Sequence, residues 1–117
     1  MTTIMQEIMR PNATDPDFPH APLDWTPADA EQQAREEELV LGDDHWETIK
    51  ALQEYFARNE VVRVRELRDA LEEKFHSRGG SRYLFTLFPK GPVAQGCRMA
   101  GVTPPPGAEN QSFGSVQ

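Results

Sequence analysis

The sequence contains a single cysteine, Cys97, among its 117 residues. One cysteine excludes a disulfide within the chain. No apolar run approaches the roughly 18 residues that cross a membrane, and no apolar stretch with a small-residue cleavage site follows Arg10. We therefore expect a soluble cytoplasmic protein without a signal peptide.

The sequence also lacks the spacings that bind metals or phosphates. Its three histidines, His20, His45 and His76, form no ligand pattern with Cys97, and no Cys-x-x-Cys pair occurs. There is no glycine-rich phosphate loop, no nucleophile-base-acid motif and no internal repeat. We expect no metal and no cofactor, and the residues leave open whether the chain is an enzyme.

Basic side chains are fewer than acidic ones, 12 against 19, which gives a formal charge of −7. Such a balance argues against general nucleic-acid binding, because phosphate neutralisation needs clustered Lys and Arg. The acidic excess lies in residues 1–47, with twelve acidic and two basic side chains, whereas residues 48–117 carry ten basic and seven acidic ones. The mildly basic second part leaves DNA open as a partner.

The length fits one domain with a modest core. Most of the ten prolines lie near the two ends of the chain. We expect a flexible N-terminal segment over 1–23, a helical domain over 24–101 and a flexible C-terminal arm over 102–117. The arm contains three consecutive prolines, which favour an extended backbone.

Three helices are expected in the first part of the domain. A capping Thr26 followed by Pro27 predicts a helix to about residue 38, and its acidic triplet 36–38 is interpreted as a solvated face. Asp43 or Asp44 should cap the next helix, which runs to about residue 59 and whose wide apolar face predicts the central helix of the core. A helix over 63–75 follows closely, which gives a helix-turn-helix outline.

The stretch 79–101 predicts two more helices, one from Ser81 to about residue 88 and one from Pro92 to Gly101. Cys97 shares a face of the last helix with Val93 and Ala100. Free cysteines are often buried, so this pattern favours a small apolar residue of the core. The alternative is a reactive thiolate.

A reactive Cys97 would need nearby cations to lower its pKa. Lys90, Arg82 and Arg98 could supply them. Arg78, Arg82, Lys90 and Arg98 are also candidates to contact an anion or the C-terminal arm, although scattered charge that aids solubility explains them equally well.

The same stretch resembles the DsrC/TusE family of small sulfur-relay proteins, which includes the so-called gamma subunit of dissimilatory sulfite reductase. The resemblance covers roughly residues 18–106 and rests on several motifs in order. These are Trp25-Thr26-Pro27, Leu-Gly-Asp-Asp-His-Trp-Glu over 41–47, Val64-Arg65-x-Leu67, Tyr-Leu-Phe-x-Leu-Phe-Pro-Lys-Gly-Pro over 83–92 and Ala-Gln-Gly-Cys-Arg-Met-Ala-Gly over 94–101.

The resemblance implies a mainly α, compact single-domain fold of about five helices, with a short N-terminal β-hairpin and a mobile C-terminal arm. Active members of the family carry a cysteine at the position of Cys97 and a second, more important one eleven positions on, as the penultimate residue of the arm. That position is Ala108 in this sequence, and residues 109–117 extend the chain beyond it. The sulfur-carrying cysteine of the arm is therefore absent.

Three hypotheses about function follow. The first is a DsrC/TusE-like protein without the arm thiol that acts as a regulatory or interaction protein of sulfur metabolism, with sulfite reductase or sulfurtransferases as partners. The second is a sulfurtransferase-type carrier that is loaded as a persulfide on Cys97, in sulfite reduction or tRNA thiolation. The third is a DNA-binding regulator that uses Arg63, Arg65 and Arg68 of the helix over 63–75.

Overall fold

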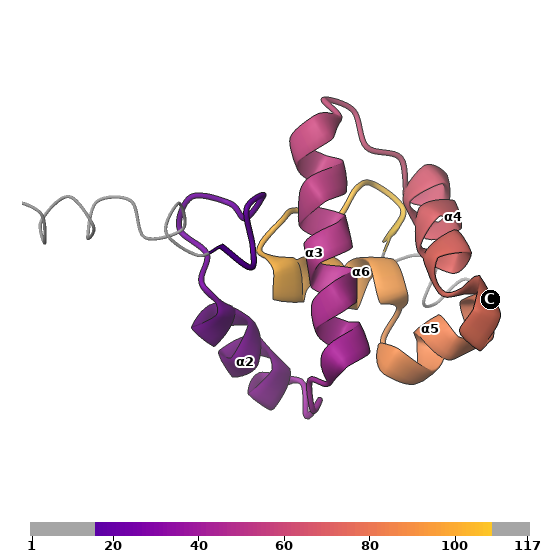
Figure 1. Ribbon diagram of the computed structural model, residues 1–117, viewed down its shortest axis with the longest axis horizontal. Coiled ribbons are helices and arrows are strands. Elements are labelled where there is room, and N and C mark those ends of the chain that lie inside the picture. The colour runs from indigo at the N-terminus through magenta and orange to yellow at the C-terminus, as the bar shows by residue number, and fades with distance from the viewer. Residues whose placement is uncertain (1–15, 109–117) are drawn as a thin grey trace, which may run out of the picture.

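The computed structural model describes residues 16–108, which form a body of helices and contain no strand (Figure 1). The helices are α2 (Pro27–Glu36), α3 (Asp43–Arg58), α4 (Val64–Lys74), the short 3-10 helix η2 (His76–Arg78), α5 (Ser81–Leu87) and α6 (Pro92–Ala100). The predicted mainly α fold is confirmed. The expected hairpin falls in the first 22 residues, of which 1–15 lie outside the described part.

Helix α6 lies at the centre of the body, where the sequence had predicted α3. Every residue of α6 except Arg98 is buried, and the helix contacts α2, α3, α4 and α5. Small side chains make this possible, because they let neighbouring helices approach closely. A Cβ atom added at Gly96 would lie only 2.8 Å from Leu52 Cδ1 of α3.

Side chains from other elements satisfy the last carbonyl groups of α6, which have no partner within the helix. The indole Nε1 of Trp25 donates to the Met99 carbonyl at 2.8 Å, and Gln53 Nε2 donates to the Ala100 carbonyl at 2.9 Å. Gly101 then takes a left-handed conformation with φ +79°. A Cβ atom at Gly101 would lie 2.5 Å from Trp25 Cδ1, so only glycine fits.

The start of α3 differs from the expectation, because Gly42 and neither aspartate is the N-cap. His45 Nδ1 accepts a hydrogen bond from the Gly42 backbone N–H at 3.0 Å. The other ring nitrogen, Nε2, lies 2.8 Å from the Leu87 carbonyl, so it donates and carries the proton. The buried His45 ring thereby joins the start of α3 to the end of α5.

The first part of the C-terminal arm packs against the body. The segment after α6, yellow in Figure 1, runs behind α3 towards α4. Pro105 is buried, Ala108 is only 2% exposed, and Gly107 lies beside Val64 at the start of α4. The flexibility of the arm stays a prediction, and residues 109–117 lie outside the described part. None of the helices within 16–108 is long and apolar enough to cross a membrane.

Helix α2 ends in a Schellman motif with a glutamate where glycine is usual. The Leu39 N–H donates to the Ala34 carbonyl at 2.8 Å, and the Glu38 N–H donates to the Arg35 carbonyl at 3.2 Å. Glu38 has φ +59°, the left-handed region that costs a residue with a Cβ atom roughly 1 kcal/mol. Its carboxylate also opposes the helix dipole.

We expect Glu38→Gly to raise the free energy of unfolding by about 0.5 to 1 kcal/mol, because glycine relieves the left-handed strain and removes the unfavourable charge. The matched control is Glu36→Gly, which removes the same charge from a helical position and should destabilise by about 1 kcal/mol. Urea unfolding of both variants measures the two changes. Changes of the same sign would contradict the prediction.

Candidate functional site

Cys97, the only thiol of the chain, is completely buried on α6, with an exposed fraction of 0%. Burial raises the pKa of the thiol from its ordinary value of 9.0 to about 12, and the charge of Arg98 opposes this only in part. Since the thiolate is the nucleophile of sulfur transfer, a thiol with this pKa is unreactive at neutral pH. Helix α6 would have to move before Cys97 could react.

Arg98, the residue after the cysteine, forms a bidentate ion pair with Glu37. Its Nε and Nη2 atoms donate to the two carboxylate oxygens at 2.8 and 2.9 Å. Gln95 Nε2 and Gln33 Nε2 donate to the same carboxylate at 2.8 and 2.7 Å. The side chain of Glu37 is only 9% exposed, so the interpretation of residues 36–38 as a solvated face is wrong for Glu37.

These bonds fasten the end of α2 to α6 next to Cys97. The hydrogen bonds from Arg98 lower the pKa of Glu37 to about 2 against the opposing effect of burial, and those from Gln33 and Gln95 add to them. A charge-assisted bidentate pair of this kind is directional as well as strong. It therefore fixes the orientation of α2 on the face of α6 that it covers.

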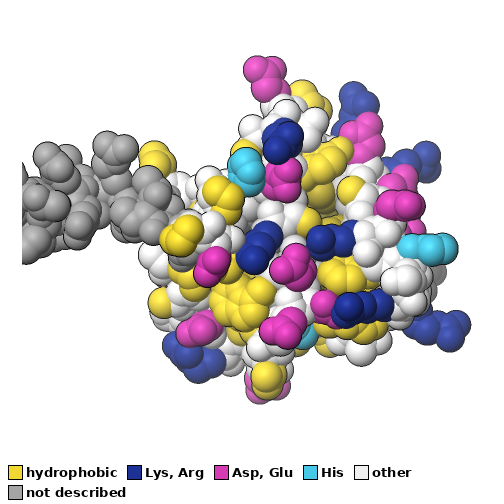
Figure 2. All heavy atoms as spheres, viewed as in Figure 1, with side chains coloured by type: hydrophobic (Ala, Val, Ile, Leu, Met, Phe, Trp, Pro, Cys, Tyr) yellow, Lys and Arg dark blue, Asp and Glu magenta, His cyan; other side chains and the backbone are white. Residues whose placement is uncertain are grey.

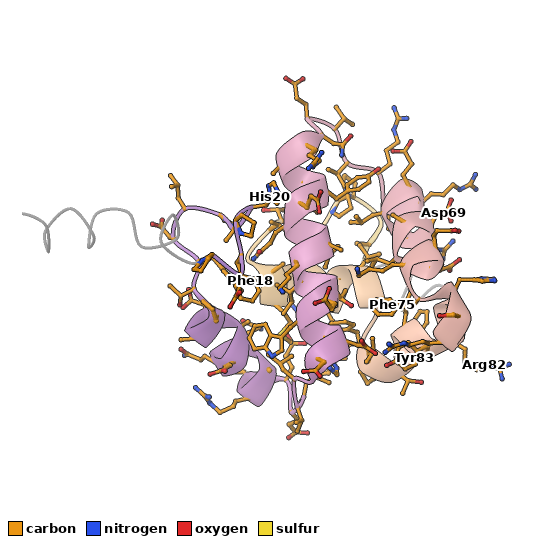
Figure 3. All side chains as sticks on the ribbon, in the orientation of Figure 1. Phe18, His20, Asp69, Phe75, Arg82 and Tyr83 are labelled. Carbon is orange, nitrogen blue, oxygen red and sulfur yellow. The ribbon has the colours of Figure 1, made fainter. Side chains whose placement is uncertain are left out.

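Arg78 is used in a second carboxylate cluster, at the start of α3. Its Nη1 atom and the Tyr83 hydroxyl both donate to Asp44 Oδ2. The two donors, Tyr83 first, lower the pKa of Asp44, and the carboxylate raises that of Tyr83. Tyr83 also packs against Phe75 with ring centroids 5.7 Å apart (Figure 3). The cluster holds η2 and α5 against the first turn of α3.

The other two predicted cations near Cys97 face solvent. Arg82 is exposed on α5 and points away from the body (Figure 3). Lys90 is exposed in the turn before α6, where its backbone N–H, and not its ammonium group, donates to Gln95 Oε1 at 3.1 Å. A role for Arg78, Arg82, Lys90 and Arg98 in contacting an anion or the arm stays a prediction.

The three arginines proposed to contact DNA lie at the start and on the surface of α4. Arg63 lies 3.8 Å from Glu66, Arg68 lies 4.0 Å from Glu72, and Arg65 is exposed. Acidic side chains are therefore interleaved with the basic ones on this surface. Within residues 16–108, no group of three or more His, Cys, Asp or Glu side chains is placed to hold a metal ion.

Sequence reasoning missed Glu37 and Gln33 as neighbours of the cysteine helix, and Gln95 as the residue of that helix that bonds to Glu37. Gln95 was the available signal, because a glutamine in a helix of small apolar residues has to find a partner when it is buried. Nothing in the sequence identified Glu37, since the partner lies 58 residues from Gln95 along the chain.

The structure defines a small helical protein whose only cysteine lies inside its central helix. A family model described as "DsrC like protein" matches residues 10–108, and the chain belongs to this family. The match ends at Ala108, the position where the arm cysteine was expected.

Relatives from several bacteria support the same membership. The chain is 39% identical over 84 residues to the sulfurtransferase TusE of Photorhabdus laumondii, which covers 70% of this chain and 76% of the relative. It is 36% identical over 84 residues to that of Yersinia pseudotuberculosis, with 70% and 78% covered, and 37% identical over 83 residues to that of Salmonella typhimurium, with 69% and 76% covered. No solved structure matches the chain.

We expect Glu37→Gln to lower the free energy of unfolding at neutral pH by up to about 3 kcal/mol, since it removes a charge that Arg98 binds. A carboxyl whose pKa falls from 4.5 to about 2 on folding contributes stability that is present above pH 4.5 and is lost as the pH falls towards 2. In urea unfolding, the difference in the free energy of unfolding between wild type and variant should therefore shrink as the pH is lowered through this range. Glu36→Gln is the control, and a gap independent of pH would refute the assignment.

We expect the Cys97 thiol to react with an aromatic disulfide reagent at least about a hundredfold more slowly in the native protein than in urea, because burial blocks access and suppresses the thiolate. The control carries Val61→Cys in a Cys97→Ser background, since Val61 is 67% exposed. That thiol should react equally fast with and without urea. Equal rates for native and unfolded wild type would contradict the burial of Cys97.

Proposed function

We propose that this protein is a sulfur-relay component of the DsrC/TusE family that binds protein partners and carries no sulfur itself. The observation that carries the proposal is the burial of its only thiol, with a pKa of about 12. Ala108 occupies the position at which the family resemblance places the sulfur-carrying cysteine of the arm. A chain with no exposed thiol has no group on which a persulfide can form.

We propose that the role is regulatory, because the chain belongs to the family of the sulfur carriers but exposes no thiol that could carry sulfur. A protein that resembles a sulfur carrier in shape can bind the carrier's partner, whether a sulfurtransferase or a sulfite reductase. Because it offers no thiolate, it accepts no sulfur and leaves the partner occupied. It would then slow the relay in proportion to its concentration, as a competitive regulator does.

A second candidate is a carrier that uses Cys97, and the name sulfurtransferase on the relatives favours it. Cys97 could form a persulfide only if α6 left the core. That movement would break the Arg98 pair with Glu37 and the Trp25 bond to Met99, and would expose the apolar faces of four neighbouring helices. The cost of those losses makes this candidate the weaker one.

DNA binding gains no support from the arrangement of α4. Its arginines alternate with Glu66, Glu72 and other acidic side chains, which would repel a phosphate backbone. A protein partner fits the charge pattern better than a nucleic acid does.

The experiment is to incubate the protein with a polysulfide and with a protein persulfide, and to read its intact mass. We expect no gain of sulfur on the wild type, and a gain on Val61→Cys in the Cys97→Ser background, where the thiol is exposed. A thiol-bearing TusE relative in the same mixture should be loaded, and should lose that sulfur more slowly to its acceptor when this protein is added. Stoichiometric loading of Cys97 with onward transfer would overturn the proposal in favour of the carrier.

A further inference from the structure

The connection between α2 and α3 is apolar where a polar loop is usual. It contains the run Leu39-Val40-Leu41, in which Val40 is 86% exposed and the two leucines are half-buried. Leu39 and Leu41 pack against the core, so Val40 is the large apolar side chain of this run that faces solvent and is available for a contact. Glu38, with its left-handed backbone conformation, ends α2 immediately before this run.

Two hollows lie beside α2 and the first half of α3, and Trp46 lines both of them. One, of about 490 Å³, is lined by Phe18, Pro27 and Trp46 among others, and the second, of about 300 Å³, by Leu39, Val40 and again Trp46. Glu31 lines both hollows as well. We call this continuous surface between α2 and the first half of α3 the α2–α3 groove. Its apolar lining is aromatic and aliphatic, which suits apolar side chains that project from one face of a bound helix.

The surroundings of the groove are strongly acidic. Residues 16–50 carry ten acidic and two basic side chains, whereas residues 51–108 carry six acidic and nine basic ones. Figure 2 shows hydrophobic side chains over α2 and the start of α3 with acidic side chains around them. Both cations of residues 16–50 line the groove: Lys50 is paired with Glu47 at 3.6 Å and lies over the Phe18 ring, and Arg35 is exposed in the second hollow, while the exposed Glu31 lines both hollows.

We infer that the α2–α3 groove is the docking surface for a basic amphipathic helix of a protein partner. Apolar residues one or two turns apart on that helix would cover Trp46 and Val40, and a Lys or Arg between them would pair with Glu31. The acidic field of residues 16–50 would speed the approach of such a helix. This inference rests on the proposed function only for the statement that the partner belongs to a sulfur relay.

The molecule offers its own comparison site. A separate hollow of about 530 Å³ lies between α4 and α5. It is lined by Asp69, Glu72 and Glu73, but by no large apolar side chain. A cationic peptide held by charge alone would bind there as readily as in the α2–α3 groove. Selection of the groove therefore requires both its acidic and its apolar character.

The probe is a synthetic helical peptide of about four turns with leucines on one face and lysines on the other, and its control replaces every lysine by glutamate. Binding to the full chain is followed by NMR through the two indole N–H signals. Trp46 lines the groove, whereas Trp25 is buried and bonded to Met99. We expect the lysine peptide to shift the Trp46 signal and to leave that of Trp25 unchanged, and the glutamate peptide to do neither.

Matched variants test the site. Val40→Lys and Glu31→Lys should each weaken binding of the lysine peptide by about tenfold or more. Val61→Lys, at a valine exposed outside the groove, and Glu73→Lys, in the comparison hollow, add the same charges and should change affinity by less than about twofold.

Several outcomes would overturn the inference. Equal losses in the groove and control variants would mean binding by net charge, and equal binding of both peptides would mean unspecific apolar contact. A Trp46 signal that shifts with protein concentration alone would assign the groove to a second copy of the chain. If the chain's own N-terminal residues compete for the groove, Ile8→Lys should weaken that competition, so a tenfold gain in affinity for the lysine peptide would assign the groove to those residues. None of these results bears on sulfur loading of Cys97, so failure here leaves the proposed function to its own test.

Discussion

The structure depends on the enclosure of α6, a helix of nine residues that contacts four other helices and in which every residue except Arg98 is buried. A helix covered on all sides must be narrow, and its terminal polar groups must find partners without water. Gly96 meets the first demand, because Leu52 of α3 lies where a Cβ atom would be. Trp25 and Gln53 meet the second by donating to the last carbonyls of α6.

The same enclosure decides the chemistry of Cys97. The contacts that bury α6 also desolvate the thiol, and the one cation beside it, Arg98, is held by Glu37. Stability and thiol reactivity are therefore opposed at this position. A second thiol on the arm would avoid that conflict, and the position at which the family resemblance predicts one is Ala108, which is buried.

Local signals in the sequence predicted several helix starts and ends, because these were encoded by neighbouring residues. Thr26 with Pro27 fixed the start of α2, and Pro92 with Gly101 fixed both ends of α6. The centre of the core was not predicted, since the wide apolar face of α3 is a stronger pattern than the small residues of α6. Gly42 as the cap of α3 was missed for a related reason, because its partner is the ring of His45 and not a capping oxygen.

The candidate site was predicted only in part, because its electrostatics depend on pairs distant in sequence. The cations Arg78 and Arg98 were identified, but their charges are used on Asp44 and Glu37, and both carboxylates come from helices that the sequence does not place beside them. Pairing removes two acidic charges from residues 16–50 and two basic charges from residues 51–108, which leaves eight acidic and two basic side chains in the first part and six acidic and seven basic ones in the second. What remains on the acidic part surrounds the apolar α2–α3 groove, the surface that we infer to bind a partner without exposing α6.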